Sequence, residues 1–497
     1  MTQAELELPD LAAEKLGGAV LYATDDYFAE KENLLKAPAA EWREHAYTDK
    51  GKWMDGWESR RKRALGTDVQ DFAIVRLGLA GVVRAVVVDT AFFRGNFPEH
   101  CALEGCTARE GTAVDELLSS RTEWVEVLGH SKLDGNAKNV FRIKSPVAFT
   151  HLRLRIFPDG GVARFRVHGD VVLDPRKVGG AAGAFDLAAL ENGGSVLACS
   201  DMFFGPKHNL IAPGRAPNMS DGWETKRRRG VTPETHDWVV VRLTGQGLVD
   251  RLELDTSWFK GNFPDTARVA GRDGDGPWRE VLPRRKLMAH TRHLYAEELR
   301  DRGPFTELRL EVFPDGGVSR MRVHGRLTEA GRDAVLFAHL ASRAPKELKD
   351  LLRACCASPV WVEHLASERP FDGTFFARVD TLWNALPITE WKAAFYAHPR
   401  LGEKRAGEGT EARWSEGEQA GTRGAPAEVL SALAQANAAY EERFGHVFLF
   451  CATGKTAAEM LASAKERLQN APDAELRVAA EELRKIMHLR LRKLVGA

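Results

Sequence analysis

The sequence predicts a multidomain protein in which two repeated antiparallel β domains, of the jelly-roll or sandwich type, precede an all-α helical domain. Three observations lead to this prediction. Blocks of sequence recur at a fixed offset in the first two thirds of the chain, and within these blocks apolar residues alternate with charged ones. Beyond about residue 328 the composition shifts to strong helix formers, with apolar residues at helical spacing.

Length and composition are those of a globular protein with several cores. At 497 residues the chain is too long for one ordinary domain, and 44% of its residues are hydrophobic while 28% are charged. The 70 Lys and Arg residues balance 70 Asp and Glu residues, so the whole molecule has no net field that would attract nucleic acid or an acidic membrane surface. We therefore expect neither nucleic acid nor membrane as a partner.

Cysteine usage and the N-terminal residues favour the cytoplasm. The six cysteines form no CxxC pair and no zinc-type Cys/His spacing, so we expect free thiols and no metal site. The first residues are acidic where a secretory signal would be basic, and no apolar stretch reaches the roughly 20 residues that span a bilayer.

The internal repeat organises residues 1–328. The segment MDGWESRRKR at 54–63 returns as SDGWETKRRR at 220–229, a shift of 166 residues that also relates 82–100 to 248–266. The block FTHLRLRIFPDGGVARFRVHG at 149–169 returns at 305–325 with a shift of 156, because intervening loops changed length. A constant offset over such windows indicates duplication.

The repeated blocks predict β-hairpins. In HLRLRIF and ELRLEVF apolar residues alternate with charged ones, and PDGG then makes a tight turn into a second alternating run. We therefore predict one β domain over 1–170, a connection over 171–192 and a second β domain over 193–328.

These doubled motifs resemble the allantoicase family. The motifs are DGWE(S/T) with its basic run, D-T-x-x-F-(R/K)-G-N-F-P and F-P-D-G-G-V-x-R-x-R-V-H-G, and the resemblance covers roughly residues 15–328. It implies two homologous jelly-roll repeats and the cleavage of allantoate to ureidoglycolate and urea.

An allantoate site needs cationic donors for the carboxylate, acceptors for the ureido N–H groups and an acid to help urea leave. The repeated blocks offer such residues in each copy, although the sequence does not single out the acid. The candidate binding residues are Asp55, Glu58, Arg94, Asn96 and His168 in the first copy, and Asp221, Glu224, Lys260, Asn262 and His324 in the second.

Structural roles compete with these functional ones. The run RRKR is commonly a solvated or ion-paired surface, and Trp57 and Trp223 fit a core better than a site. His168 and His324 end β runs, where a histidine serves a turn as readily as it serves acid–base chemistry. The sequence also leaves open whether one repeat or both carry a site.

The last third, residues 335–497, is predicted to be all-α. Alanine, leucine and charged helix formers dominate it, and the final helix places apolar residues such as Leu476, Leu483 and Met487 on one face. The predicted helices cover 346–356, 374–386, 426–443, 455–469 and 473–495.

Four short stretches of this third resemble 2-oxo-4-hydroxy-4-carboxy-5-ureidoimidazoline (OHCU) decarboxylase. They are ERPF at 368–371, AHPRLGE at 397–403, SEGEQAG at 415–421 and FGHVFLFCATG at 444–454, followed by Arg-Leu at 490–491. The resemblance implies His398 as the catalytic histidine. The implied substrate-binding residues are Pro399, Ser415, Glu416, Gly417, Glu418, Gln419, the backbone of Phe448, Leu449, Phe450, Cys451 and Ala452, and Arg490.

The chemistry of this substrate needs no cofactor. Its ring imine can accept the electrons released as CO₂ leaves, so the protein must only hold the substrate and deliver a proton. His398 can exchange a proton at neutral pH, with Glu418 as its orienting or proton-sharing catalytic partner. We expect no metal and no organic cofactor.

Two functions follow from the sequence. The first is a bifunctional enzyme of urate breakdown, which hydrolyses allantoate with its β half and decarboxylates OHCU to (S)-allantoin with its helical domain. The alternative is a non-catalytic, ligand-binding β pair fused to an active decarboxylase, because sandwich folds often bind without catalysis. The expected partners are the small-molecule substrates allantoate and OHCU, with a homo-oligomer as a further possibility.

Overall fold

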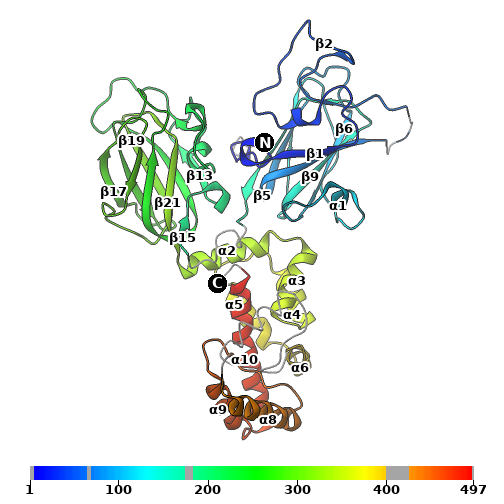
Figure 1. Cartoon of the computed structure of the whole chain (residues 1–497), viewed down its shortest axis with the longest axis vertical. Helices are drawn as coiled ribbons and strands as arrows, with labels where there is room; N and C mark the ends of the chain where they lie inside the picture. The colour runs from blue at the N-terminus through cyan, green and yellow to red at the C-terminus, as the bar shows by residue number, and fades with distance from the viewer. Residues whose placement is uncertain (1–4, 64–65, 67–68, 174–182, 399–424, 495–497) are drawn as a thin grey trace. The chain divides into compact units, whose positions relative to one another are not determined.

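The computed structural model describes residues 5–63, 66, 69–173, 183–398 and 425–494. One compact unit contains both β repeats and ends at Arg332, and the other begins at Asp333 (Figure 1). Predicted strands and helices appear in the expected parts of the chain, so the predicted fold class is confirmed.

The first repeat is an antiparallel sheet built around one long strand. Strand β5 (Asp71–Asp89) pairs with β1 and β9 along its first half and with β8 and β11 along its second half. The sheet order is β1-β5-β9-β6-β7. The other strands are β1 (Ala19–Ala23), β6 (His100–Cys106), β7 (Val125–Lys132), β8 (Lys138–Arg142), β9 (Ala148–Phe157) and β11 (Arg164–Val171).

The pairing of β5 changes part-way along the strand. Its register slips between Arg76 and Gly81, where the strand leaves one set of neighbours for the next. A β-carbon on Gly81 would lie 2.4 Å from the carbonyl oxygen of Asp170, so only glycine fits where β5 meets β11. The buried apolar residues of β5, β9 and β11 form the core of this repeat.

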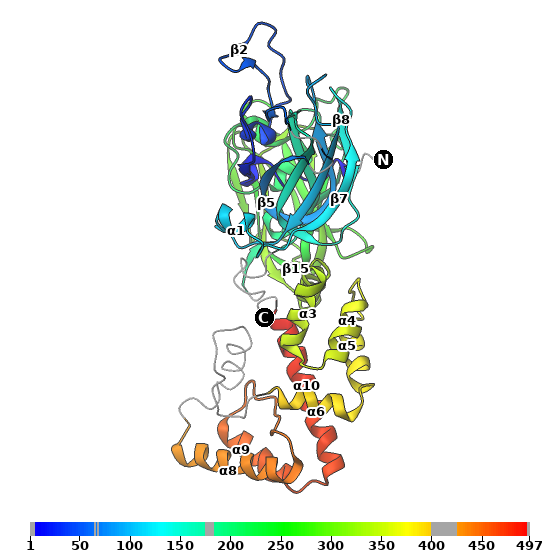
Figure 2. The same ribbon diagram turned by 90° about the vertical axis from the view of Figure 1, so that its right-hand side faces the viewer.

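Short elements complete the first repeat. Strand β4 (Trp57–Glu58) pairs with β10 (Gly161–Val162), and β2 (Tyr47–Thr48) pairs with β3 (Gly51–Lys52) in a small hairpin (Figure 2). The helical turns are α1 (Val114–Leu118), η2 (Glu14–Leu16) and η3 (Lys31–Leu35).

The second repeat follows the same plan around β15 (Asp237–Asp255), with sheet order β12-β21-β15-β19-β16-β17. Its short pair β14 (Trp223–Glu224) and β20 (Gly317–Val318) corresponds to β4 and β10. The remaining elements are β12 (Phe185–Asp186), β13 (Ser195–Cys199), β16 (Thr266–Arg272), β17 (Arg279–Lys286), β18 (Arg292–Tyr295), β19 (Phe305–Phe313), β21 (Arg320–Leu327), η5 (Leu190–Asn192), η6 (Lys207–Ile211) and η7 (Met219–Asp221).

The helical unit agrees with the predicted helices to within about two residues at each end. Helix α10 buries the predicted apolar face, including Leu483 and Met487. Helices α2, α4 and α6 were not among those predicted. The helices are α2 (Glu329–Ala341), α3 (Pro345–Cys355), α4 (Pro359–Ser367), α5 (Phe375–Asn384), α6 (Ile388–Tyr396), α8 (Ala427–Phe444), α9 (Ala457–Arg467) and α10 (Pro472–Lys493).

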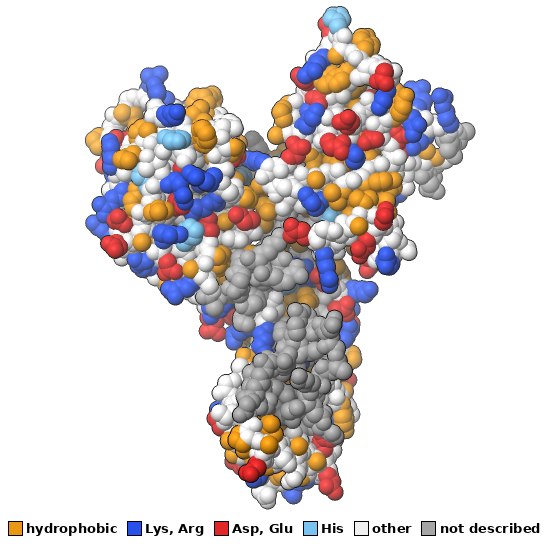
Figure 3. Space-filling model, viewed as in Figure 1, with side chains coloured by type: hydrophobic (Ala, Val, Ile, Leu, Met, Phe, Trp, Pro, Cys, Tyr) orange, Lys and Arg blue, Asp and Glu red, His pale blue; other side chains and the backbone are white. Residues whose placement is uncertain are grey.

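The surface agrees with the balanced composition. Lys and Arg side chains are interspersed with Asp and Glu on the face shown in Figure 3. All six cysteines are free thiols. In the described part of the chain, no helix has the length and apolar character needed to cross a bilayer.

Candidate active sites

The doubled Asp-Gly-Trp-Glu segment lies against the Pro-Asp-Gly-Gly turn in each repeat. In the first repeat Glu58 pairs with Gly161 and Trp57 pairs with Val162. A β-carbon on Gly161 would lie 1.9 Å from the Phe93 ring, so the turn needs glycine to pack over that buried phenylalanine. The second repeat repeats these contacts, with Gly317 packed against Phe259.

The aspartate of each motif forms an ion pair with an arginine, which is buried in the first repeat and partly buried in the second. Asp55 Oδ2 accepts a hydrogen bond from Nη2 of Arg164 at 2.7 Å, and Asp221 Oδ2 accepts one from Nη2 of Arg320 at 2.6 Å. Burial opposes ionisation of Asp55, but the Arg164 guanidinium and the Glu41 N–H more than offset it, so the pKa of Asp55 is lowered. Both aspartates therefore serve the fold.

The tryptophans are fully buried, as expected, and the basic run has structural partners. Trp57 Nε1 donates to the Asp25 carbonyl at 2.8 Å. Arg60 binds the Asp25 carboxylate at 2.7 Å, and Lys62 binds the buried Asp71 carboxylate at 2.7 Å. Part of the run thus forms ion pairs rather than a free cationic surface.

The glutamate of each motif faces a pocket and is held by an asparagine. Asn96 Nδ2 donates to Glu58 Oε1 at 2.7 Å, and Asn262 Nδ2 donates to Glu224 Oε1 at 2.6 Å. The backbone carbonyl of Asn96 accepts from the Gly161 N–H, so the same turn orients both partners. Burial raises the pKa of Glu58, although the Asn96 hydrogen bond opposes that effect.

Each of these pairs lines a cavity of about 400 Å³, within the usual range for small-molecule sites. The first cavity combines Glu58, Arg94 and Asn96 with aromatic and lysine side chains. Its lining residues are Phe28, Trp42, Lys50, Gly51, Lys52, Met54, Glu58, Phe92, Arg94, Gly95 and Asn96.

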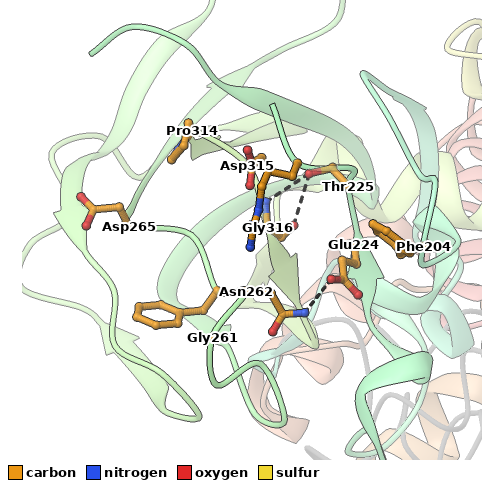
Figure 4. A pocket seen from close by; sticks show the side chains of 11 residues that line it. Phe204, Glu224, Thr225, Gly261, Asn262, Asp265, Pro314, Asp315 and Gly316 are labelled. Carbon is orange, nitrogen blue, oxygen red and sulfur yellow. Dashed lines mark hydrogen bonds between the residues drawn. The ribbon is translucent and has the colours of Figure 1, made fainter. Parts of the chain in front are cut away.

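The second cavity, drawn in Figure 4, is bordered by Glu224 and Asn262 on one side and by Asp265 and Asp315 on others. Lys260, a predicted binding residue, is not among its lining residues. These residues are Phe204, Glu224, Thr225, Arg227, Gly261, Asn262, Phe263, Asp265, Pro314, Asp315 and Gly316.

The loop that carries each asparagine has one residue in the left-handed region. Phe92 has φ 68° and Trp258, its counterpart, has φ 73°. The Phe92 N–H donates to Asn136 Oδ1 at 2.8 Å, and the Trp258 N–H to His290 Nδ1 at 2.8 Å. Such a conformation costs about 1–3 kcal/mol. Phe92 is one of the residues that line the first cavity, so this strained position lies at the candidate site.

The predicted histidines lie away from both cavities. His168 Nδ1 is 2.8 Å from the Leu8 carbonyl, and His324 pairs with the β12 edge at Asp186. Burial lowers the pKa of His324. Their positions favour the structural role that the sequence left open.

The candidate decarboxylase site is described only in part. His398 ends the turn after α6, and its N–H donates to the Phe395 carbonyl at 3.1 Å. Arg490 is buried on α10. Pro399, Ser415, Glu416, Gly417, Glu418 and Gln419 lie outside the described residues.

A buried polar network fixes the backbone of 448–452. Arg467 Nη1 donates to the Leu449 carbonyl at 2.8 Å, and Arg467 also binds the fully buried Glu475 carboxylate at 2.6 Å. Glu482 accepts a hydrogen bond from the Cys451 N–H at 2.7 Å. Charges on α9 and α10 therefore hold this segment in place.

Sequence reasoning missed part of the first cavity wall. Phe28 lies there because its N–H bonds the Glu58 carbonyl, and Trp42, Lys50 and Lys52 come from a segment without a matching block in the second repeat. This segment, residues 36–54, is longer than its counterpart at 212–220, and that difference in length is the feature of the sequence that could have indicated these residues.

Comparisons with known proteins identify both units. The allantoicase repeat family matches residues 9–172 and 185–328, and the OHCU decarboxylase family matches residues 342–492. The probable allantoicase of Photobacterium profundum is 46% identical over 331 residues, covering 64% of this chain and 97% of that protein. The probable allantoicase of Nocardia farcinica is 48% identical over 321 residues, covering 65% of this chain and 95% of that protein.

The fold of the β unit has a solved counterpart. The crystal structure of the allantoicase of Saccharomyces cerevisiae superposes with a TM-score of 0.54 at 34% sequence identity, covering 65% of this chain and 95% of that one. The chain therefore belongs to the allantoicase family and carries an OHCU decarboxylase domain after its two allantoicase repeats.

Proposed function

We propose that this chain is a bifunctional enzyme of urate breakdown. Its β unit hydrolyses allantoate to (S)-ureidoglycolate and urea, and its helical unit decarboxylates OHCU to (S)-allantoin. The observation that carries the proposal is the union of both families in one chain. The paired glutamate and asparagine at a cavity in the β unit supply suitable chemistry.

The glutamate is suited to the acid role that the sequence left unassigned. Allantoate carries a carboxylate and two ureido groups on one carbon. The Glu58 carboxylic acid donates its proton to one ureido nitrogen. The bond between that nitrogen and the central carbon breaks, and neutral urea is released. The lone pair of the remaining ureido nitrogen forms a C=N bond in the same step.

Water completes the reaction. The ionised glutamate accepts a proton from a water molecule as the water oxygen attacks the C=N carbon, which yields ureidoglycolate and restores the acid. The Asn96 amide donates a hydrogen bond to Oε1 of the Glu58 carboxyl and so holds this carboxyl in one orientation. Burial favours the protonated form that the first step requires.

For the helical unit we propose His398 and Glu418 as the proton-exchanging pair. The ring imine accepts the electrons of the breaking C–C bond, and delivery of the proton to one face gives one allantoin enantiomer. Ser415, Gln419, Arg490 and the backbone of 448–452 are proposed to hold the ureido, carbonyl and anionic groups. We further propose a cytoplasmic location and assembly into a homo-oligomer.

Urea release separates this function from a merely ligand-binding β unit. The full chain, incubated with allantoate, should produce urea and ureidoglycolate in equal amounts. The His398→Asn variant serves as a control whose decarboxylase is impaired and whose β unit is intact. Binding of allantoate without urea formation would show the non-catalytic alternative to be right.

A further inference from the structure

The two cavities share a glutamate–asparagine pair but differ in their walls. Glu58 with Asn96 and Glu224 with Asn262 occupy equivalent positions, and Phe28 and Phe204 flank them through the same backbone contacts. Gly95 and Gly261 also correspond, but the other lining residues differ because the first cavity extends toward residues 42–54 and the second toward the Pro-Asp-Gly-Gly turn at 314–317. A difference in function between the repeats must arise from residues that only one repeat has.

One segment accounts for most of the difference. Residues 36–54 join η3 to the motif in the first repeat, whereas residues 212–220 make the same connection in the second. The longer segment forms the β2–β3 hairpin and brings Trp42, Lys50 and Lys52 to the first cavity.

The longer segment gives the first cavity a cationic wall. Lys50 and Lys52 of this segment line it together with Arg94 of the following loop, and among the described residues that line it Glu58 has the one carboxyl group. The Lys52 ammonium lies 4.6 Å from the centre of the Trp42 ring and donates to the Arg43 carbonyl at 2.6 Å. Among the described residues, neither the Lys50 ammonium nor the Arg94 guanidinium has a hydrogen-bond or ion-pair partner, so both can bind an anion.

The second cavity has the opposite balance. Of the described residues that line it, Arg227 is the one cation, while Glu224, Asp265 and Asp315 are acidic. Lys286 pairs with Asp265 and the Arg228 N–H binds Asp315, which reduces this negative charge without making it positive. The first repeat has Glu99 and Asp159 at the positions of Asp265 and Asp315, so the charge difference between the repeats lies on the side of the pair that the hairpin forms.

The side of the second pair that corresponds to the hairpin is occupied by the protein itself. Asn262 Nδ2 lies 3.3 Å from the Met219 sulfur, and Trp258 Nε1 donates to the Ala216 carbonyl at 2.7 Å. The Met219 side chain and the Ala216 backbone of the short segment thus lie on the side of the pair where the first repeat presents lysines.

We infer that the first repeat alone binds and hydrolyses allantoate, with Lys50 and Arg94 holding its carboxylate beside Glu58, and that the second repeat does not turn over this substrate. This inference rests on the proposed allantoate hydrolysis. Lys50 and Arg94 anchor the carboxylate in both the bound substrate and the transition state, whereas Glu58 transfers the proton. Replacing Lys50 or Arg94 should therefore raise KM, whereas replacing Glu58 should lower kcat.

The test compares matched positions in the two repeats. In the full chain, Glu58→Gln should lower kcat for urea release by about 100-fold or more, while Glu224→Gln should change it less than threefold. Lys50→Gln and Arg94→Gln should each raise KM for allantoate about tenfold or more, whereas Lys260→Gln, at the position equivalent to Arg94, should leave KM unchanged.

A neutral analogue isolates the role of charge. Methylenediurea has the two ureido groups of allantoate but lacks the carboxylate. Its inhibition constant against allantoate should be the same in the wild type, Lys50→Gln and Arg94→Gln. A parallel loss of methylenediurea binding would mean that these lysine and arginine residues shape the cavity rather than bind the carboxylate, which would overturn the inference.

The remaining outcomes are distinct. If Glu58→Gln and Glu224→Gln each remove about half of kcat, both repeats are active and the inference is wrong. If only Glu224→Gln is inactive, the site belongs to the second repeat. A wild-type chain that releases no urea from allantoate would refute the proposed function itself. Near-ultraviolet circular dichroism and retained OHCU decarboxylation confirm that each variant is folded.

Discussion

Replacing Arg164 by methionine tests whether the doubled motif holds the fold. The Arg164 guanidinium donates to Asp55 Oδ2 at 2.7 Å and to the carbonyls of Pro38 and Ala163 at 2.9 and 2.7 Å. The side chains of Arg164 and Asp55 are only 3% and 6% exposed. Methionine occupies similar space but leaves the buried Asp55 carboxylate with only the half-exposed Lys36 ammonium, 4.0 Å away, as a cation.

The expected loss is large because the carboxylate cannot regain water. Breaking a buried ion pair by removing one partner costs about 3–5 kcal/mol. For a unit of about 330 residues the unfolding entropy is near 0.7 kcal/mol/K, so the midpoint of thermal unfolding should fall by about 4 to 7 °C.

Differential scanning calorimetry of the full chain measures this shift in the transition of the β unit. The matched control is Arg84→Met, which breaks an ion pair with Asp170 at the same 2.7 Å distance but with side chains 39% and 36% exposed. That change should cost about 1 kcal/mol or less. Equal shifts in the two variants would refute the argument from burial.

The pH dependence of the free energy of unfolding gives a second measure of the Asp55–Arg164 ion pair. Because the pKa of Asp55 is lowered in the folded chain, its ion pair contributes stability above the unfolded pKa of about 3.9, and that stability is lost as pH falls through the folded pKa. The difference in stability between wild type and Arg164→Met should therefore shrink at acidic pH. A constant difference down to pH 2 would contradict this assignment.

Three further predictions concern the two chemistries and the helical unit. His398→Asn should lower OHCU decarboxylation by about 100-fold, with loss of enantiomeric purity in the allantoin formed, and leave urea release from allantoate unchanged. Tyr440→Phe removes the hydroxyl that donates to the buried Glu475 carboxylate, so chemical denaturation of the helical unit should report a loss of about 1–3 kcal/mol, whereas Arg467→Met should cost about 3–5 kcal/mol. If Glu58 is the acid, kcat for urea release should fall as pH rises through a pKa above the ordinary value of about 4.3; a rate that increases over that range would exclude this role.

Duplication and alternation made most of the fold predictable. The constant shift of 166 residues located both repeats, and period-2 alternation located strands such as β9 and β19. The same reasoning could not show that β5 and β15 each run for 19 residues, because Gly81 marks a shift of register within the strand and not a strand end.

The site was predictable where a residue recurs and faces a cavity, as Glu58 and Asn96 do. Recurrence alone did not separate them from Asp55, whose carboxylate faces inward to Arg164. On a strand as short as β4, neighbouring residues point to opposite sides, and the sequence does not reveal which side opens to solvent. Lys50 was missed because it occurs in one repeat only.

Retention of a motif in both copies is thus evidence for structure before it is evidence for catalysis. Within Asp-Gly-Trp-Glu, the aspartate forms the buried ion pair, the glycine lies against Phe93 and the tryptophan is fully buried, so three of four positions are required by packing in either repeat. A copy that lost activity would keep them for stability. Differences between the copies therefore carry the functional information, and here they lie in the hairpin that gives one cavity its lysines.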